Sequence, residues 1–154
     1  MLTRIQSLYL FLAAMLALGS MMMPFWSFQS SQTILFGDFT QVQGASIIVT
    51  AGSMAGGIFS PLTGIVSIVS IFLFKNRKLQ KLLILLCFIL FAGDLLSGLI
   101  AAHFLKEFLQ AGGAAVTHKP EAGFFLLLPE PVLFWLATLG VKKDEKIATA
   151  YKRL

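Results

Sequence analysis

Two acidic residues, Asp94 and Glu130, stand near the middle of long apolar stretches of this sequence. An ionised carboxylate at the centre of a membrane-spanning helix costs on the order of 3 kcal/mol on the scale derived from insertion experiments. No Lys or Arg falls at that depth in any apolar stretch, so an ion pair is excluded. Protonation, hydrogen bonds with hydroxyl groups or water must compensate, and we predict that Asp94 carries a proton and faces the protein interior.

Small and hydroxyl-bearing residues recur at helical spacing in the stretch that precedes Asp94. The row consists of Ser53, Gly57, Ser60, Gly64 and Ser67. Such residues let helix backbones approach closely while serine hydroxyls donate across the contact. Since Gly64 lies between them, Ser60 and Ser67 are the two candidates for a hydroxyl that faces Asp94.

A second face of small residues contains Asp94 itself. Its members recur at three- and four-residue spacing and are Asp94, Ser97, Gly98, Ala101 and Ala102. We expect this face to point into a helix bundle, with Ser97 as a further polar group. The residues expected to pack helices together are Gly57, Gly64, Gly98 and Ala102.

Glu130 lies between two prolines, in the sequence PEP. Pro129 and Pro131 have no N–H to donate, which frees carbonyl groups near Phe125 and Leu127 and predicts a kinked helix. A protonated Glu130 can donate to one of these carbonyl oxygens. The two acids are therefore interpreted as structural hydrogen-bonding groups, as a relay for protons or cations, or as contacts to a partner subunit.

Membrane-spanning helices must position these residues. Hydrophobic residues make up 57% of the 154 residues, and the mean hydropathy is +0.85. Charged residues make up only 12%, against roughly a quarter in soluble domains. Four unbroken apolar stretches, at about 5–26, 54–74, 82–105 and 122–141, are long enough to cross a bilayer. The sequence predicts an all-α membrane protein, a single domain of four transmembrane helices with a tail at 142–154.

Positive charges are distributed unevenly between the two sides of this predicted bundle. Ten of the twelve Lys and Arg residues fall on one side, and only Lys106 and Lys119 fall on the other. Cations that flank short loops are retained in the cytoplasm, so both termini are expected there. Anionic lipid is the expected partner of these cations, and nucleic acid is not. The cations that set this topology include Lys75, Arg77, Lys78, Lys81, Lys142, Lys143 and Lys146.

The first apolar stretch is expected to remain as an anchor. Arg4 and the segment ALGS at 17–20 also fit a removable signal peptide, but the apolar run continues to Trp26, which suits a membrane interface. The following connection contains QTILFGDFTQVQG, where Gly37 and Asp38 separate two runs rich in β-branched and aromatic residues. This pattern predicts a short β-hairpin that turns at these two residues on the periplasmic side.

Motifs of enzymes and metal sites are absent from the sequence. His103 and His118 have no third ligand in a recognisable pattern, and no HExxH occurs, so no zinc site is predicted. The glycines of GSMAGG lack the Lys of a phosphate-binding loop, and no Gly-x-Ser-x-Gly elbow occurs. Cys87 is the only cysteine, which excludes an internal disulfide. We expect no enzymatic activity, no metal and no cofactor.

The C-terminal segment VKKDEKIATAYKRL forms an amphipathic pattern if it is helical. Ile147, Tyr151 and Leu154 then lie on one narrow apolar stripe surrounded by cations. We expect this segment to lie on the inner leaflet of the membrane. A frayed, solvated end and a partner-binding helix are the alternatives.

Three segments carry a resemblance to a known family: MLTRIQSLYLFLAA at the N-terminus, IFLFKNRKLQ in the middle and VKKDEKIATAYKRL at the end. In their order and spacing the chain resembles a family of short four-helix bacterial inner-membrane proteins, catalogued as the domain of unknown function four-two-nine-three. The last residues depart from the tail of that family, which is richer in Arg and Asp. The resemblance implies a fold and a location, and no activity.

Two functions follow as hypotheses. The preferred one is a structural or accessory subunit of an inner-membrane assembly, whose partners are the lipid bilayer and either another membrane protein or a second copy of the chain. The alternative is a small proton-coupled channel or transporter that uses Asp94 and Glu130. A hydrated path to both acids favours transport, whereas a dry bundle with an exposed apolar flank favours a partner.

Overall fold

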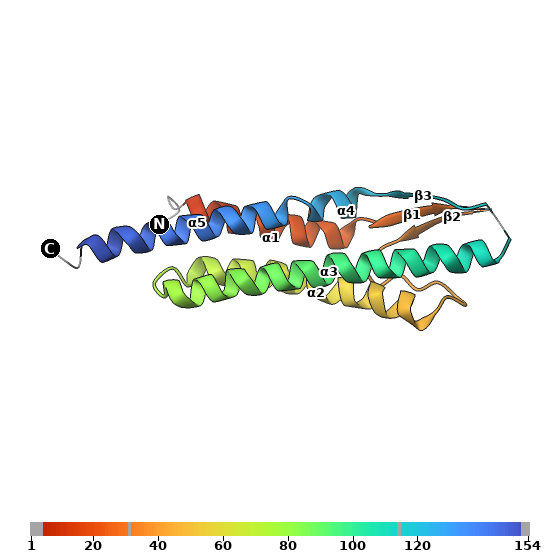
Figure 1. Cartoon of the computed structure of the whole chain (residues 1–154), viewed down its shortest axis with the longest axis horizontal. Coiled ribbons are helices and arrows are strands. Elements are labelled where there is room, and N and C mark those ends of the chain that lie inside the picture. Colours follow the sequence, from red (N-terminus) through yellow and green to blue (C-terminus); the bar gives the residue numbers. More distant parts are fainter. Residues whose placement is uncertain (1–4, 31, 114, 152–154) are drawn as a thin grey trace.

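The computed structural model describes residues 5–30, 32–113 and 115–151. The molecule is elongated, with long helices along its axis and a small sheet at one end, called here the sheet end (Figure 1). The start of α1, the α2–α3 connection and the end of α5 lie at the opposite end, called the connection end. The elements in chain order are α1 Ile5–Met22, β1 Trp26–Gln29, β2 Thr33–Phe36, α2 Ile47–Phe72, α3 Arg77–Ala111, β3 Thr117–Pro120, α4 Ala122–Leu127 and α5 Glu130–Tyr151.

The helices form a bundle in which each long helix contacts two others. Helix α2 packs against α1 and α3, and α5 packs against the same two helices from the other side. Four helical segments are apolar and long enough to cross a membrane: α1, α2, α3 and the segment Ala122–Thr149 of α4 and α5. The prediction of four such helices is confirmed. Helices α2 and α3 begin earlier than the apolar stretches 54–74 and 82–105, because helical hydrogen bonding continues into the more polar ends.

The fourth apolar stretch is interrupted. Helix α4 ends at Leu127 and α5 begins at Glu130, with a turn at residues 128 and 129. Two prolines spaced by one residue remove two backbone donors within one turn and disfavour helical geometry at the residues before them. The prediction of a kink located the irregularity correctly but underestimated it, because the helix is divided into two.

A three-stranded antiparallel sheet closes the sheet end of the bundle, with the strand order β2-β1-β3. Trp26 of β1 pairs with Phe36 of β2 on one side and with Pro120 of β3 on the other. Both connections at this end of the molecule thus contribute strands to one sheet. The fold is mostly helical with a small sheet, and the third strand of this sheet was not part of the prediction of an all-α bundle with a short hairpin.

The predicted hairpin exists, but its turn lies elsewhere. The chain reverses between Gln29 and Thr33, whereas Gly37 and Asp38 follow the second strand. The first strand begins at Trp26, where the apolar run ends, so the hairpin lies closer to the N-terminus than predicted. Residues 37 and 38 are thereby free to contact α2.

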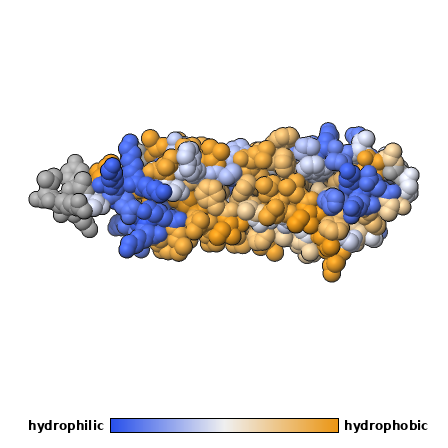
Figure 2. Space-filling model, in the orientation of Figure 1, coloured by the Kyte–Doolittle hydropathy of each residue, from blue (hydrophilic) through white to orange (hydrophobic). Residues whose placement is uncertain are grey.

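The polarity of the surface changes along the length of the molecule, and the core consists of separate clusters. Figure 2 shows a broad apolar band with hydrophilic residues at both ends, the pattern expected of a protein that spans a bilayer. The core of the sheet end consists of Phe25, Phe28, Phe36, Val49, Ala101, Ala102, Leu105 and Leu127. A second core cluster contains Leu10, Ala13, Ile84, Cys87, Phe134, Ala137 and Val141.

Candidate functional site

Asp94 of α3 is buried and hydrogen-bonded to α2. Its side chain is 5% exposed, and Ser60 Oγ donates to Asp94 Oδ2 at 2.5 Å. Ser60 was one of the two hydroxyls expected at this position. The Oγ atoms of Ser20 and Ser60 lie 3.5 Å apart, which brings α1 to the same place. A hydroxyl both donates and accepts, so this group of residues can hold the carboxyl in either protonation state.

A third acid, Asp38, approaches Asp94 from the loop after β2. A Cβ atom placed on Gly56 would lie 2.5 Å from Asp38 Oδ1 and 3.2 Å from Asp94 Oδ1. The two carboxyl groups therefore face each other across the space that the missing side chain of Gly56 leaves. Burial, and in second place the charge of Asp94, raises the pKa of Asp38 to about 7.

The loop that carries Asp38 is fixed to α2 by hydrogen bonds with Ser53. Phe39 N–H donates to Ser53 O at 3.1 Å, and Ser53 Oγ donates to Gly37 O at 2.8 Å. Phe39 has a φ of 56°, a left-handed conformation that is uncommon for a residue with a side chain. Its ring covers Gly57, where a Cβ atom would lie only 2.4 Å away. Asp38 is thus held in place by the residues on both sides of it.

Asp38 was not predicted as a site residue, because Gly37 and Asp38 were assigned to the hairpin turn. The adjacent glycines Gly56 and Gly57 were the available signal, since two glycines in a helix mark a surface that something approaches closely. Gly57 was attributed to helix packing instead, and Gly56 was given no role. The contact joins residues that are separated in sequence, and local spacing cannot reveal it.

Glu130 is the first residue of α5 and is fully buried, with 0% of its side chain exposed. Neither carboxylate oxygen has a hydrogen-bond partner among the described residues. The expected hydrogen bond to a carbonyl near Phe125 or Leu127 is therefore not formed. Glu130 interacts electrostatically with Asp94 and with Cys87.

The other two predicted polar residues do not contact the carboxyl group of Asp94. Ser67 Oγ lies 3.4 Å from Cys87 Sγ, two helical turns beyond Ser60. Ser97 Oγ donates to the backbone oxygen of Asp94 at 2.9 Å, which is a bond within α3. Of the two serines proposed to face this acid, only Ser60 does so.

Buried hydroxyl groups continue along one face of α2 over about 25 Å, at 1.5 Å per residue. We call this row the α2 hydroxyl row; each member is at most 2% exposed, and it consists of Ser53, Ser60, Thr63, Ser67 and Ser70. At the connection end, buried Gln80 of α3 donates from Nε2 to Ser70 O at 3.0 Å. Thr63 Oγ1, Ser70 Oγ and Gln80 Oε1 are buried without a hydrogen-bond partner among the described residues. A polar row thus runs along the interior from the Asp38 loop to the connection end.

Residues 2–154 match the model of a protein family described as Domain of unknown function (DUF4293). The chain belongs to this family. The match covers nearly the whole sequence and confirms the resemblance seen in its three segments. No curated protein and no solved structure matches the chain.

The small residues of the DUF4293 chain serve several kinds of contact. A Cβ atom on Gly64 would lie 3.0 Å from Leu18 of α1, so this glycine packs two helices together. A Cβ atom on Gly98 would lie 2.9 Å from the ring of Phe25, so both Gly98 and Gly57 adjoin aromatic rings. Ala102 belongs to the buried core of the sheet end.

One close helix contact was not predicted from the sequence. A Cβ atom on Gly52 of α2 would lie 2.6 Å from the Cβ of Ala101 and 2.8 Å from the backbone oxygen of Ser97, both on α3. Gly52 lies outside the predicted row of small residues, one position before Ser53. The packing face of α2 is therefore wider than the spacing of that row indicated.

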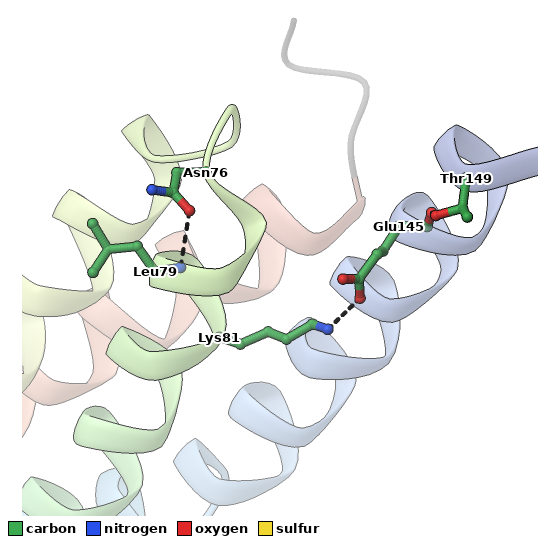
Figure 3. Close-up of polar contacts among 5 residues, drawn as sticks. All are labelled: Asn76, Leu79, Lys81, Glu145 and Thr149. Atoms are coloured by element: carbon green, nitrogen blue, oxygen red, sulfur yellow. Dashed lines mark hydrogen bonds and ion pairs between the residues drawn. The ribbon is translucent and has the colours of Figure 1, made fainter. Parts of the chain in front are cut away.

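The predicted topology cations gather at the connection end. Lys81 forms an ion pair with Glu145, which joins α3 to α5, and Asn76 Oδ1 accepts from Leu79 N–H at 3.2 Å at the start of α3 (Figure 3). Exposed cations surround this contact: Lys75, Lys78, Lys142, Lys143 and Lys146, with Arg77 half-buried.

The tail is not a separate segment. Helix α5 continues without a break to Tyr151, so residues 142–151 extend the fourth helix along its own axis (Figure 1). This differs from the expected helix on the membrane surface, because helical hydrogen bonding continues through Gly140 and into the charged residues without a break. Ile147 is exposed, and the side chains of Tyr151 and Leu154 lie outside the described residues.

Proposed function

We propose that this DUF4293 chain is a multi-pass protein of the bacterial inner membrane that transfers protons through its interior. Both termini and the connection end are cytoplasmic in this proposal, because cations gather there. The observation that carries the proposal is Glu130, which is fully buried, has no hydrogen-bond partner among the described residues and lies within electrostatic reach of Asp94. Asp38 supplies access from the periplasmic side.

A purely structural acid should be hydrogen-bonded. A buried polar group without a partner costs about 1–3 kcal/mol, and native proteins hold few such groups. Thr63 Oγ1 and Ser70 Oγ share this property and lie on the α2 hydroxyl row. Carboxyl and hydroxyl groups that keep unused donors and acceptors can exchange protons with each other or with intervening water. The proposed route runs from Asp38 through Asp94 and Glu130 to the α2 hydroxyl row.

Proton flux into liposomes tests the proposal. Purified protein is reconstituted with an enclosed pH-sensitive dye, and a potassium diffusion potential drives proton entry. The wild type should acidify the lumen faster than protein-free vesicles. Glu130→Gln should reduce this flux at least about tenfold, since a positioned proton-transfer group commonly contributes about 10²–10⁴-fold.

The matched control is Glu107→Gln, which also neutralises one acid but at an exposed site beside His103. This variant should retain the wild-type flux. A flux equal to that of protein-free vesicles, or an unchanged flux in a folded Glu130→Gln protein, would contradict proton transfer.

The proposed topology has its own test. A reporter that is active only in the periplasm should give no signal when it is fused after Arg77, in the cationic connection between α2 and α3. The same reporter after Gly113, between α3 and β3, should give a strong signal. A signal at Arg77 would overturn the orientation without bearing on proton flux.

A structural or accessory subunit of a membrane assembly is the second candidate. The bond from Ser60 to Asp94 favours it, because hydrogen bonds between helices hold bundles together in lipid. The partner would be another membrane protein or a second copy. Cross-linking in native membranes followed by a pull-down tests this function: a specific partner retained by Asp94→Asn and Glu130→Gln, with cellular function intact, supports it. Absence of any specific partner would count against it.

A further inference from the structure

A cavity of about 160 Å³ lies at the sheet end, between the sheet and α3. Trp26 and Phe28 stand on the same face of β1 because they are two residues apart in a strand. His118 of β3 is directly opposite Phe28 in the strand register and lines the cavity with them. Aromatic rings therefore form one wall of this cavity, and an imidazole stands beside them.

Helix α3 supplies the opposite wall. Leu99, Ala102, His103 and Lys106 line the cavity, and their spacing of three and four places them on one helix face. The apolar members come first along the helix, and the polar members lie nearer to its end. The cavity is thus apolar toward the middle of the bundle and cationic toward the sheet end.

The polar groups that line the cavity are hydrogen-bond donors. Trp26 Nε1–H donates to His118 Nδ1 at 3.2 Å, so neutral His118 must carry its proton on Nε2, where it can donate. Lys106 makes no hydrogen bond or ion pair with any residue in the described part of the chain. No Asp or Glu lines the cavity, although Glu107 lies 3.4 Å from Nε2 of His103 at its margin.

We propose that this cavity binds a phosphate group, held by Lys106 and His118. A ligand that only accepts hydrogen bonds and carries negative charge matches a lining of donors with one unpaired ammonium. The volume is below the roughly 300–1,000 Å³ of pockets for drug-sized ligands, so a single headgroup fits and a large molecule does not. The phosphate belongs either to a phospholipid, whose chains then follow Leu99 toward the apolar band, or to free inorganic phosphate.

Native mass spectrometry of the full chain in dodecyl maltoside, which has no phosphate, tests this proposal. Added phosphatidylglycerol should be retained by the wild type and by Lys106→Arg, and should be lost severalfold more readily from Lys106→Gln. Lys119→Gln is the matched control, because Lys119 is the other cation at this end and pairs with Glu121 outside the cavity. Equal losses from the two glutamine variants, or no retention by the wild type, would overturn the proposal.

The fluorescence of Trp26 distinguishes the two sources of phosphate. In a Trp135→Phe background, Trp26 is the only tryptophan and reports directly on the cavity. A saturable change with inorganic phosphate that also displaces phosphatidylglycerol identifies free phosphate as a ligand. A saturable change with phosphatidylglycerol alone identifies the lipid headgroup. No saturable change with either probe contradicts the site.

Discussion

Asp94 and Glu130 are both buried acids of the bundle, yet their surroundings differ. The carboxyl group of Asp94 accepts a hydrogen bond from Ser60 and faces the carboxyl of Asp38, whereas that of Glu130 has no hydrogen-bond partner among the described residues. The protein thus compensates one acid with a hydroxyl and leaves the other uncompensated. Structural and chemical roles can therefore reside on two acids of one bundle, and their substitution by leucine should change the free energy of unfolding in opposite directions.

The largest effect on the free energy of unfolding is expected from substitution of Glu130. Glu130→Leu should raise the free energy of unfolding by about 1–3 kcal/mol, because it removes a buried polar group that has no partner and keeps a similar volume. Equilibrium unfolding in mixed micelles with increasing dodecyl sulfate measures this change. A clear destabilisation would mean that Glu130 contributes a stabilising contact, and its contrast with Asp94 would disappear.

Asp94→Leu should change the free energy of unfolding in the opposite direction. It removes the partner of Ser60 and should lower the free energy of unfolding by about 0.5–2 kcal/mol. Asp94→Asn keeps the size and the hydrogen bond, so the fold should remain intact in the same assay. If Asp94→Asn folds normally but loses proton flux, ionisation of Asp94 matters; if the flux is unchanged, Asp94 is a structural group only.

The loop that carries Asp38 should respond to pH. Its pKa is about 7 in the folded protein against 3.8 for the free side chain, so the docked loop retains a proton that the undocked loop releases. The loop that carries Asp38 is held most strongly against α2 below about pH 4, and this docking weakens as the pH rises to about 7. The backbone amide hydrogen of Phe39 should therefore exchange with solvent a few-fold faster at pH 7 than at pH 4, after its rate is corrected for intrinsic exchange.

Asp38→Asn provides the control for this pH effect. The variant has no carboxyl to titrate, so the protection of the Phe39 amide should be nearly independent of pH between 4 and 7. Persistence of the full pH dependence in Asp38→Asn would assign it to another group. The contact between Asp38 and Asp94 would then not govern the loop.

The smallest effect is expected at Ser67. Ser67→Ala should cost about 0.5 kcal/mol or less, because its hydroxyl contacts only the weakly polar thiol of Cys87. Ser60→Ala should cost about 1 kcal/mol or more, since it leaves a buried carboxyl group without its donor. Equal costs in the mixed-micelle assay would remove the distinction between the two serines.

Local patterns in the sequence determined the class of the protein and part of its site. Lipid offers no hydrogen-bond partner to backbone groups, so four long apolar stretches imply four helices, and this follows from composition alone. Asp94 in such a stretch required compensation by protonation, hydroxyl groups or water, and helical spacing reduced the candidate hydroxyls to Ser60 and Ser67. These inferences succeeded because they depend on periodicity within one element.

Only the tertiary structure decided which distant segments meet. Strand β3 pairs with β1 across most of the chain, Asp38 enters the gap at Gly56, and His103 and His118 line one cavity. Pairing of backbone groups between distant strands leaves no mark in local spacing, and four residues are too few for a clear alternating pattern. A glycine likewise does not indicate which neighbour approaches it. The packing of the whole chain therefore decided that three acids share one interior.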